Sequence, residues 1–370
     1  MSAVIRILAL VTDAWGAYGG IAQYNRDLLE ALSDSAAVAH IDVLSLGRVE
    51  SPQRAKIAVR DAGGSRFRFV AMALRAVRRQ RPTVIFCAHI HFMRVAAIMK
   101  RISGRPIWLQ IHGIDAWERP RPADTRATLR ADLVTAVSRF TRARFLSWAA
   151  LAPEHVHVLP NTVQAMFHPG PRRSAFRQAQ LVPTAAWPVL CTVARLSSHD
   201  RYKGIDRVIA ALPDLICQYP DLIYLIAGGG DDQARLAFNA ERLGVSERVR
   251  FLGRVEPEVL PQLYRESDLF VMPSTKEGFG IVFIEAMACG TPALGLDVDG
   301  SVDALLEGQL GHLADMNQLP ASIAAAVSDT RDRESLSQKT LKCFGKPAFA
   351  ANIARLLKQI EQRFAEPTPS

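Results

Sequence analysis

The sequence predicts an α/β protein made of two doubly wound domains in tandem. Short, nearly continuous apolar runs alternate along the chain with stretches that have the 3.6-residue period of amphipathic helices. The alternation stops once, at a proline-containing segment without a clear period, and then begins again. A chain of 370 residues is also too long for one ordinary hydrophobic core. We therefore expect two domains, each with a parallel sheet that helices cover on both faces.

In the first domain, each strand is predicted from a run rich in Val, Ile or Leu that turn residues bound. These runs are residues 5–11, 41–46, 84–88, 107–111, 133–137 and 156–159. The stretches between them favour helices, because their apolar residues recur every three or four positions. The expected helices are residues 21–32, 67–79, 92–102 and 139–148.

The segment 164–188 is predicted to link the domains, since its four prolines favour neither a helix nor a central strand. After it we expect strands at residues 189–194, 222–227, 249–252, 269–272 and 292–296, and helices at 205–219, 232–243, 257–266, 282–289 and 348–364. The predicted domains are an N-terminal domain at 1–163 and a C-terminal domain at 189–345. The remaining residues, 346–370, are predicted to form a C-terminal helix and tail, and the candidate surface for their packing is the N-terminal domain.

The composition indicates a soluble globular protein, with 49% apolar and 22% charged residues. No apolar run reaches the roughly 18 residues that a membrane-spanning helix needs. The first apolar run, at 4–11, fits a β-strand better than a signal peptide. The five cysteines are scattered, which is typical of buried, reduced thiols and predicts neither a disulfide framework nor a zinc site. We therefore expect a cytoplasmic protein.

The formal net charge of +9 is concentrated in the N-terminal half. Residues 1–160 hold 23 Lys and Arg against 12 Asp and Glu, whereas the rest of the chain holds 22 against 24. Residues 66–81 carry six arginines and no acidic residue, and as a helix they place Phe67, Leu74 and Val77 on one apolar stripe toward the sheet. The basic excess leaves two interpretations open, which are a solvated face and peripheral contact with the inner face of an anionic membrane. No nucleic-acid partner is expected, because no recognised binding motif accompanies the charge.

The strongest functional signal lies between a predicted strand and the helix after it. Glu277 falls in the loop at the carboxyl end of the strand, and Glu285 falls within the helix. Phe279 and Gly280 open that helix, so its free N–H groups can point at a phosphate or sugar oxygen. One carboxylate can accept hydrogen bonds from sugar hydroxyls, and the other can grip the vicinal hydroxyls of a ribose. This division suits a ligand with a sugar at each end and phosphates between them.

Residues 277–292 resemble the E-x7-E block of family 4 glycosyltransferases. They match the family pattern E-G-F-G-x-x-x-x-E-A-M-A-x-G-x-P at every fixed position. Members of this family are retaining enzymes with the GT-B fold, in which two Rossmann-like domains face a central cleft. The resemblance implies that the domain at 1–163 is the acceptor side and that the domain at 189–345 binds the nucleotide-sugar. The resemblance implies that Glu277 contacts the donor sugar and that Glu285 contacts the nucleotide ribose. The donor-site residues that it implies beside these carboxylates are Gly278, Phe279 and Gly280.

A second block consists of Arg195, at the end of a predicted strand, and Lys203, just before the next helix. An Arg and a Lys that converge at such a turn can neutralise a diphosphate. The pair is similar to the R-L…K-G pair of the family, which holds the leaving diphosphate. The polar insert 197–202 between them is either a loop that closes over the donor or, as we expect, a solvated loop.

Motifs at other strand ends are weaker signals when taken alone. Gly19 and Gly20 follow the first strand and resemble the first glycine loop of the family, which lies against the donor phosphate and the acceptor. His112 stands just past a strand in an H-G-x-D pattern similar to that of the family, where the His supports the sugar in the transition state. By the same resemblance, Gly228 and Val255 lie in loops that wall the nucleotide.

No metal or other cofactor is expected, and the nucleotide-sugar is a substrate. The triplet Asp297-Val298-Asp299 has the D-x-D form that binds a divalent ion in transferases of another fold. Two acidic residues in a glycine-containing loop are an insufficient ligand set, however, and the second block already supplies cationic charge. The sequence lacks the G-x-G-x-x-G pattern of dinucleotide cofactors and the G-x-S-x-G pattern of hydrolases.

The predicted function is retaining transfer of a hexose from a nucleotide-sugar, GDP- or UDP-sugar being favoured, to a glycan or polyprenyl-linked acceptor in polysaccharide or glycoconjugate synthesis. The catalytic residues implied by the resemblance are Glu277, His112, Arg195 and Lys203. Two alternatives stay open. A nucleotide-sugar 2-epimerase of the same fold would interconvert the donor without an acceptor, and a catalytically silent protein would only bind the nucleotide-sugar. These motifs do not encode the donor base and sugar, the acceptor or the oligomeric state.

Overall fold

The structure, a computed structural model, describes residues 5–16, 19–50, 52, 54–172, 176, 179–180 and 182–364. The chain divides into two compact units, Met1–Thr162 with Lys346–Ser370 (unit 1) and Val163–Gly345 (unit 2). Residues 163–188, which overlap the expected linker, thus group with unit 2, where the ring of Phe167 lies 6.0 Å from that of Tyr264. The tail 365–370 lies outside the described residues.

Unit 1 contains a seven-stranded sheet whose adjacent strands are all parallel. Its strands are β1 (Ile5–Val11), β2 (Val38–Ser45), β3 (Ile57–Asp61), β4 (Val84–Cys87), β5 (Ile107–Ile111), β6 (Leu133–Ala136) and β7 (Val156–Val158). The spatial order is β3-β2-β1-β4-β5-β6-β7. Strand β3 was not predicted, because only its first residue is fully buried and its sequence lacks a long apolar run.

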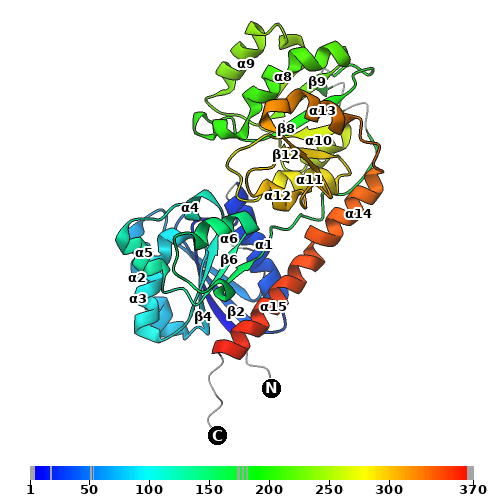
Figure 1. The fold of residues 1–370 in the computed structure, drawn as a ribbon. Coiled ribbons are helices and arrows are strands. Elements are labelled where there is room, and N and C mark those ends of the chain that lie inside the picture. Colours follow the sequence, from blue (N-terminus) through cyan, green and yellow to red (C-terminus); the bar gives the residue numbers. More distant parts are fainter. Residues whose placement is uncertain are drawn as a thin grey trace. The chain divides into compact units, whose positions relative to one another are not determined.

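Helices cover both faces of this sheet (Figure 1). They are α1 (Gly20–Asp34), α2 (Arg66–Gln80), α3 (Met93–Ser103), α4 (Ile114–Trp117), α5 (Pro122–Thr128), α6 (Arg139–Leu146) and α15 (Lys346–Phe364). Helix α15 packs against α1, so the C-terminal helix does return to the N-terminal unit. Within the described ranges, no helix is both long and apolar enough to cross a bilayer.

The apolar face of α2 differs from the predicted stripe. Phe69 and Ala73 lie in the core together with Val77, whereas Phe67 is 92% exposed. The ring of Phe69 stacks on that of Phe92 at a centroid distance of 4.7 Å, which fixes the helix in this rotation. The sequence stripe was therefore wrong at its first residue, because a partner ring from another element decides which phenylalanine turns inward.

Unit 2 contains a six-stranded sheet, again with parallel neighbours. Its strands are β8 (Val189–Val193), β9 (Ile223–Ala227), β10 (Val249–Gly253), β11 (Leu269–Val271), β12 (Ala293–Leu296) and β13 (His312–Ala314), in the order β10-β9-β8-β11-β12-β13. Its helices are α8 (Ile205–Gln218), α9 (Gln233–Arg242), α10 (Leu260–Glu266), α11 (Ile281–Ala288), α12 (Ser301–Ala304), α13 (Leu319–Val327) and α14 (Arg333–Phe344). One core cluster joins α8, α9 and α13 to the sheet.

Each sheet has a point at which the strand order reverses, between β1 and β4 in unit 1 and between β8 and β11 in unit 2. In open parallel sheets, ligands bind outside the carboxyl ends of the strands at this point. The loops after β1 and β4, and those after β8 and β11, are therefore where each unit is built to hold a ligand. The α/β fold class expected from the sequence is confirmed for both units.

Candidate functional site

In unit 2 a short 3-10 helix, η3 (Ser198–Lys203), follows β8 in the chain. It lies beside the loop that follows β11. Gly204 ends η3 with a φ of 76°, and a Cβ there would lie 2.4 Å from the carbonyl oxygen of Pro273. The N–H of Thr275 donates to the carbonyl of Tyr202 at 3.0 Å. Only glycine permits both this φ and this close approach. The result is that Lys203 is brought against the loop that carries Glu277.

Lys203 and Glu277 form an ion pair between Nζ and Oε1. Their side chains are 21% and 10% exposed, so the pair lies at the margin of the protein interior. The backbone of Glu277 is fixed as well, because its N–H donates to Oδ2 of Asp299 at 2.6 Å. The fold thus joins one cation expected at the diphosphate to one carboxylate expected at the donor sugar.

Asp299, the second acid of the D-x-D triplet, is used within the loop itself. Its carboxylate accepts from the N–H of Glu277 and, at 2.9 Å, from the N–H of Ser301. Burial raises the pKa of Asp299 to about 6, against the opposing effect of these hydrogen bonds. Over the part of the chain that the structure describes, no group of three or more His, Cys, Asp or Glu side chains is arranged to hold a metal ion. The observed contacts of Asp299 are those of a loop-fixing residue.

Arg195 lies just past β8, and its Nη2 is 3.0 Å from Oδ2 of Asp200. The side chain of Arg195 is 81% exposed, in contrast to the buried Asp200. Arg195, Asp200 and Lys203 line the same small cavity. The two predicted cations are therefore at one site, each beside its own carboxylate. Asp200 was missed as a site residue because the polar insert gives no periodic signal.

The insert 197–202 is not the solvated loop that was expected. The carboxylate of Asp231 accepts from the N–H of Ser198 at 3.0 Å and from its hydroxyl at 2.6 Å. These bonds hold the pKa of Asp231 below its ordinary value. Nε of Arg201 donates to Asp232 at 2.9 Å. Two consecutive acids at the start of α9 thus fix η3, and with it the position of Lys203.

Gly228 shows how closely the strand ends of unit 2 approach one another. A Cβ on Gly228 would lie 1.7 Å from the carbonyl oxygen of Ala194, immediately before Arg195. The N–H of Gly228 donates to the carbonyl of Gly253 at 2.7 Å, and Val255 follows half-buried. Gly228 and Val255 therefore border the same strand ends as Arg195, although through backbone contacts.

Glu285 lies on α11 and is buried. The hydroxyl of Tyr264, itself fully buried, donates to Oε2 of Glu285 at 3.0 Å. Burial, followed by the charge of Glu285, raises the pKa of Tyr264, so the phenol remains a donor. Sequence reasoning missed Tyr264, because a tyrosine within an amphipathic helix reads as a core residue.

The three residues just before α11 differ in which of their groups can face a ligand. Gly280 is the N-cap of α11, and no side chain caps its first turn. Gly278 is half-buried in the loop beside Glu277. The ring of Phe279 is buried against Phe344 at a centroid distance of 5.6 Å. Phe279 can therefore face a ligand only with its backbone.

In unit 1, Gly19 and Gly20 lie at the start of α1, after β1, and both are exposed. The preceding Tyr18 lies outside the described residues. His112 follows β5, its Nε2 is 2.9 Å from the carbonyl oxygen of Ala88, and its N–H donates to Asp115 at 3.2 Å. Burial lowers the pKa of His112 to about 4 and raises that of Asp115 to about 7. The imidazole is therefore neutral at physiological pH, with its proton on Nε2 and a lone pair on Nδ1.

His89 is a second buried histidine at this sheet edge, two residues after the end of β4. Its Nδ1 accepts from the N–H of His91 at 3.2 Å, and its ring centroid lies 6.5 Å from that of His112. Burial lowers the pKa of His89 to about 3, so its ring is neutral as well. Its place at the strand end was the signal that sequence reasoning did not use.

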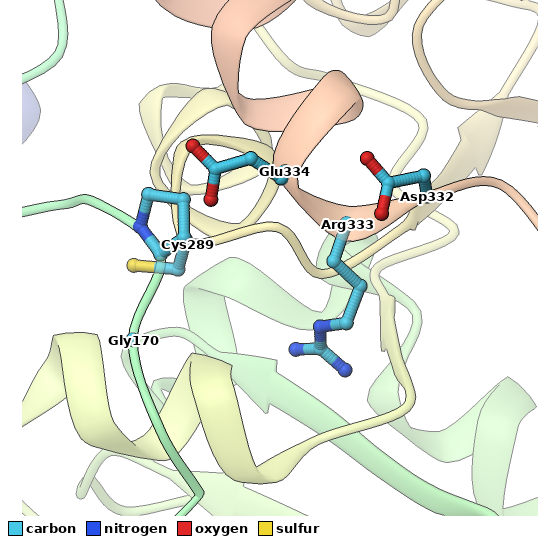
Figure 2. Close-up of a pocket in the computed structure, with 6 residues that line it drawn as sticks. Gly170, Cys289, Asp332, Arg333 and Glu334 are labelled. Carbon is cyan, nitrogen blue, oxygen red and sulfur yellow. The ribbon is translucent and has the colours of Figure 1, made fainter.

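A separate pocket of unit 2 contains none of the predicted site residues. It is lined by Pro169, Gly170, Cys289, Asp332, Arg333 and Glu334. Figure 2 shows Arg333 extending away from the carboxylates of Asp332 and Glu334. Its guanidinium donates to the carbonyls of Arg265 and Ser267 and to the hydroxyl of Thr291. Arg333 thus satisfies the last carbonyls of α10, which is a structural role.

In comparisons with known proteins, the two halves of the chain match two family descriptions. Residues 18–165 match the family described as Glycosyltransferase Family 4, and residues 177–342 match the family described as Glycosyl transferases group 1. Among solved structures, HepE of Anabaena in complex with UDP superposes with a TM-score of 0.78 at 24% identity, over 96% of this chain and 100% of that one. Sucrose-phosphate synthase of Thermosynechococcus elongatus gives 0.78 at 21% identity, over 96% and 99%. These likenesses show the GT-B fold.

Curated relatives are more similar in sequence. A GDP-mannose-dependent α-(1-6)-phosphatidylinositol monomannoside mannosyltransferase of Mycolicibacterium smegmatis is 33% identical over 67% of this chain and 66% of its own length. The monoacylated-substrate counterpart of Corynebacterium glutamicum is 31% identical over 64% of this chain and 68% of its own. The chain thus spans just under two thirds of the first relative, and 40% of a D-inositol 3-phosphate glycosyltransferase 2 of Catenulispora acidiphila. With both halves matched and the E-x7-E block complete, the chain belongs to the group 1, family 4 glycosyltransferases.

Proposed function

We propose that this protein is a retaining glycosyltransferase that moves a hexose from a nucleotide-sugar to a glycan or lipid-linked acceptor in glycoconjugate or polysaccharide synthesis. The observation that carries the proposal is the Lys203–Glu277 ion pair at the strand-order reversal of unit 2. A cation and a carboxylate side by side match the junction between a diphosphate and its sugar. Arg195 adds a second cation at the same cavity.

In the proposed reaction, the bond between the anomeric carbon and the β-phosphate oxygen breaks while the acceptor oxygen bonds to the same face of the sugar. The acceptor proton passes to the departing phosphate, so no protein base is required. Lys203 and Arg195 stabilise the charge that builds on the diphosphate. Glu277 orients the donor sugar by accepting from its hydroxyls, and the Nδ1 lone pair of His112 accepts from another. Glu285, held by Tyr264, grips the ribose.

The proposed donor is a GDP- or UDP-sugar, and the proposed reaction is independent of metal. The names of the mannosyltransferase relatives include GDP-mannose, and HepE has been solved with UDP-glucose as well as UDP. A thermal-shift panel of GDP-mannose, UDP-glucose and ADP-glucose, with EDTA present, tests this. A ligand at one hundred times its Kd stabilises the fold by about 2.7 kcal/mol, which shifts Tm by several degrees. If no nucleotide-sugar raised Tm, the donor proposal would be wrong.

The stereochemistry of the product tests the reaction class. With the donor that stabilises the fold and a panel of inositol and polyprenyl-linked acceptors, we expect NMR to show that the anomeric configuration of the donor is kept in the product. An inverted product would contradict the retaining mechanism. Epimerisation of the donor at C2 without an acceptor would favour the epimerase instead.

We also propose that α2 contacts an anionic membrane. Arg75, Arg78 and Arg79 are exposed on α2, Phe67 is 92% exposed at its start, and Ile98 on the adjacent α3 is 48% exposed. Cations near a lipid surface contribute about 1 kcal/mol each. Exposed apolar side chains among them provide a contact with the acyl region.

Vesicle flotation tests the membrane contact. The protein is expected to float with phosphatidylglycerol vesicles at low salt but not with phosphatidylcholine vesicles. The triple variant Arg75→Glu, Arg78→Glu, Arg79→Glu is expected to lose this binding. Arg242→Glu, at an exposed position on α9 of unit 2, is the control and should still float. Equal flotation of the two variants would contradict the proposal that α2 contacts the membrane.

A further inference from the structure

Helix α15 packs on α1 (Figure 1). This packing brings aromatic rings from distant parts of the chain together. Phe349 on α15 is buried, and its ring centroid lies 6.2 Å from that of Tyr24 on α1, at an interplanar angle of 81°. Edge contacts of this kind are attractive beyond the apolar area that they bury. Phe349 therefore supports one side of the Tyr24 ring.

The hydroxyl end of Tyr24 is held just as firmly. It donates to Oε1 of Gln110 at 2.8 Å, and Gln110 is a residue of β5 two positions before His112. The same Oε1 accepts from the hydroxyl of Thr135 on β6, and Nε2 of Gln110 donates to the carbonyl of Ile111 at 2.9 Å. All three side chains in this network are buried. The plane of the Tyr24 ring is thus determined by the sheet and by α15 together.

The Tyr24 ring in turn meets His112 in a T-shaped contact, with centroids 5.1 Å apart and an interplanar angle of 85°. On its other side, the imidazole is bonded through Nε2 to the carbonyl of Ala88. One hydrogen bond leaves a ring free to pivot about it, and an aromatic edge against the ring removes that freedom. The direction of the Nδ1 lone pair of His112 is therefore set by Tyr24.

We infer that Tyr24 is a positioning residue for His112, and that Phe349 makes the C-terminal helix part of this support. The inference rests on the proposed function, in which His112 orients the donor sugar. A displacement of about 1 Å in such a group lowers the rate by about a hundredfold in enzymes that depend on orientation. Tyr24 and Phe349 contact other side chains of the protein, and His112 is the proposed site residue among these contacts. Both residues therefore affect the reaction through His112.

The test compares Phe349→Ala with Ile360→Ala. Ile360 is also buried on α15, but eleven residues further along, which is about 16 Å of helix. Both variants lose core contacts, whereas only the first loses the support of Tyr24. For Phe349→Ala we expect kcat to fall about tenfold or more with the KM for the donor unchanged, as for a lost transition-state contact. For Ile360→Ala we expect kcat near that of the natural protein.

A second measurement requires no substrate, so it separates this inference from the proposed function. The ring signals of His112 and of the neighbouring His89 are followed by NMR between about pH 3 and 8. Burial now lowers the pKa of His112 to about 4. In Phe349→Ala, water reaches the loosened ring, and its midpoint should move up toward the ordinary value of 6.5. Phe349→Leu restores the bulk and should return both kcat and midpoint toward those of the natural protein.

Identical behaviour of Phe349→Ala and Ile360→Ala in kcat and in the His112 titration would overturn the inference. If neither alanine variant folds, Phe349→Val against Ile360→Val makes the same comparison at lower cost to the core. A shifted titration without any transfer activity in the natural protein would contradict the proposed function but leave the support of His112 intact.

Discussion

Among single residues, the Lys203–Glu277 pair is the sharpest test of the site. Glu277→Ala and Lys203→Ala are each expected to lower kcat/KM at least about a hundredfold, the scale of a lost electrostatic contact in a transition state. Because the two side chains are ion-paired and act on one ligand, the double variant should cost little more than either single one.

Steady-state kinetics with the identified donor provide the measurement, and circular dichroism checks that each variant is folded. Near-normal turnover of either single variant would contradict the assignment. Fully additive losses in the double variant would mean that the pair does not act as a unit.

Tyr264 offers a second test at residue scale. Tyr264→Phe removes the hydroxyl that donates to Glu285 and keeps the buried ring. A hydrogen bond to a charged group contributes about 1.5–3 kcal/mol, so we expect donor affinity to fall about tenfold or more while kcat changes little. Tyr224→Phe is the matched control, since it also removes a buried hydroxyl of unit 2, one bonded to Thr192. Equal donor affinity of the two variants in calorimetry would exclude a role for Tyr264.

Asp27 on α1 is expected to make the free energy of unfolding depend on pH. Burial raises its pKa from 3.8 to about 7 in the folded chain. Between about pH 4 and 7 the folded chain therefore keeps a proton that the unfolded chain has lost, and the free energy of unfolding falls as the pH rises across this window. Asp27→Asn removes this effect. Relative to the variant, the natural protein should lose at most about 4 kcal/mol between pH 4 and 8.

Urea unfolding across that pH range measures the difference. Asp34→Asn, at an exposed position of the same helix, is the control and should follow the natural protein. Parallel pH profiles for Asp27→Asn and the natural protein would contradict the assignment.

At the scale of elements, the loop after β9 is the most constrained part of the site. Gly228→Ala places a Cβ 1.7 Å from the carbonyl oxygen of Ala194, at a φ of 140° that side chains rarely adopt. The backbone of two strand ends must move, so we expect a loss of about 3 kcal/mol or more. Gly229→Ala, one residue further, meets no atom within 4 Å and should change stability by less than about 1 kcal/mol. Similar melting temperatures for the two variants would refute the close approach.

The elements themselves were predictable where burial is continuous. The strands β1 and β5 are found at the expected residues, and both are almost wholly buried. The C-terminal part of unit 2 was not predicted beyond β12, since β13 has only three residues and only one of them is fully buried. Helix α14 escaped prediction because its core-facing positions include serine and threonine, whose hydroxyls bond to nearby carbonyls.

Apart from Glu285 on α11, the predicted site residues lie in the segments that follow strand ends, as the pattern of strands and loops required. What the pattern could not supply are the contacts made across loops, such as Asp299 to Glu277 or Tyr264 to Glu285. These contacts join residues about twenty positions apart in the sequence, and the folded backbone brings them together. A pattern that repeats every two to four residues cannot predict such contacts.

At the scale of the whole molecule, the charge of the chain follows its division into units. The basic excess counted for residues 1–160 falls within unit 1, whereas the donor residues of the proposed reaction belong mainly to unit 2. In the proposed function, unit 1 contacts the anionic membrane and unit 2 binds the nucleotide-sugar. High ionic strength should therefore weaken membrane contact more than donor binding.

Helix α15 has a consequence for how the chain is made. Unit 1 is assembled from two stretches of sequence, and the second is translated only after the whole of unit 2 has been translated. Until then the surface of α1 that α15 covers has no partner, and Tyr24 lacks its contact with Phe349. Unit 2, in contrast, is continuous, and every strand of its sheet is translated before α15. The nascent chain is thus expected to mature out of order, with its later-synthesised unit reaching the native state first.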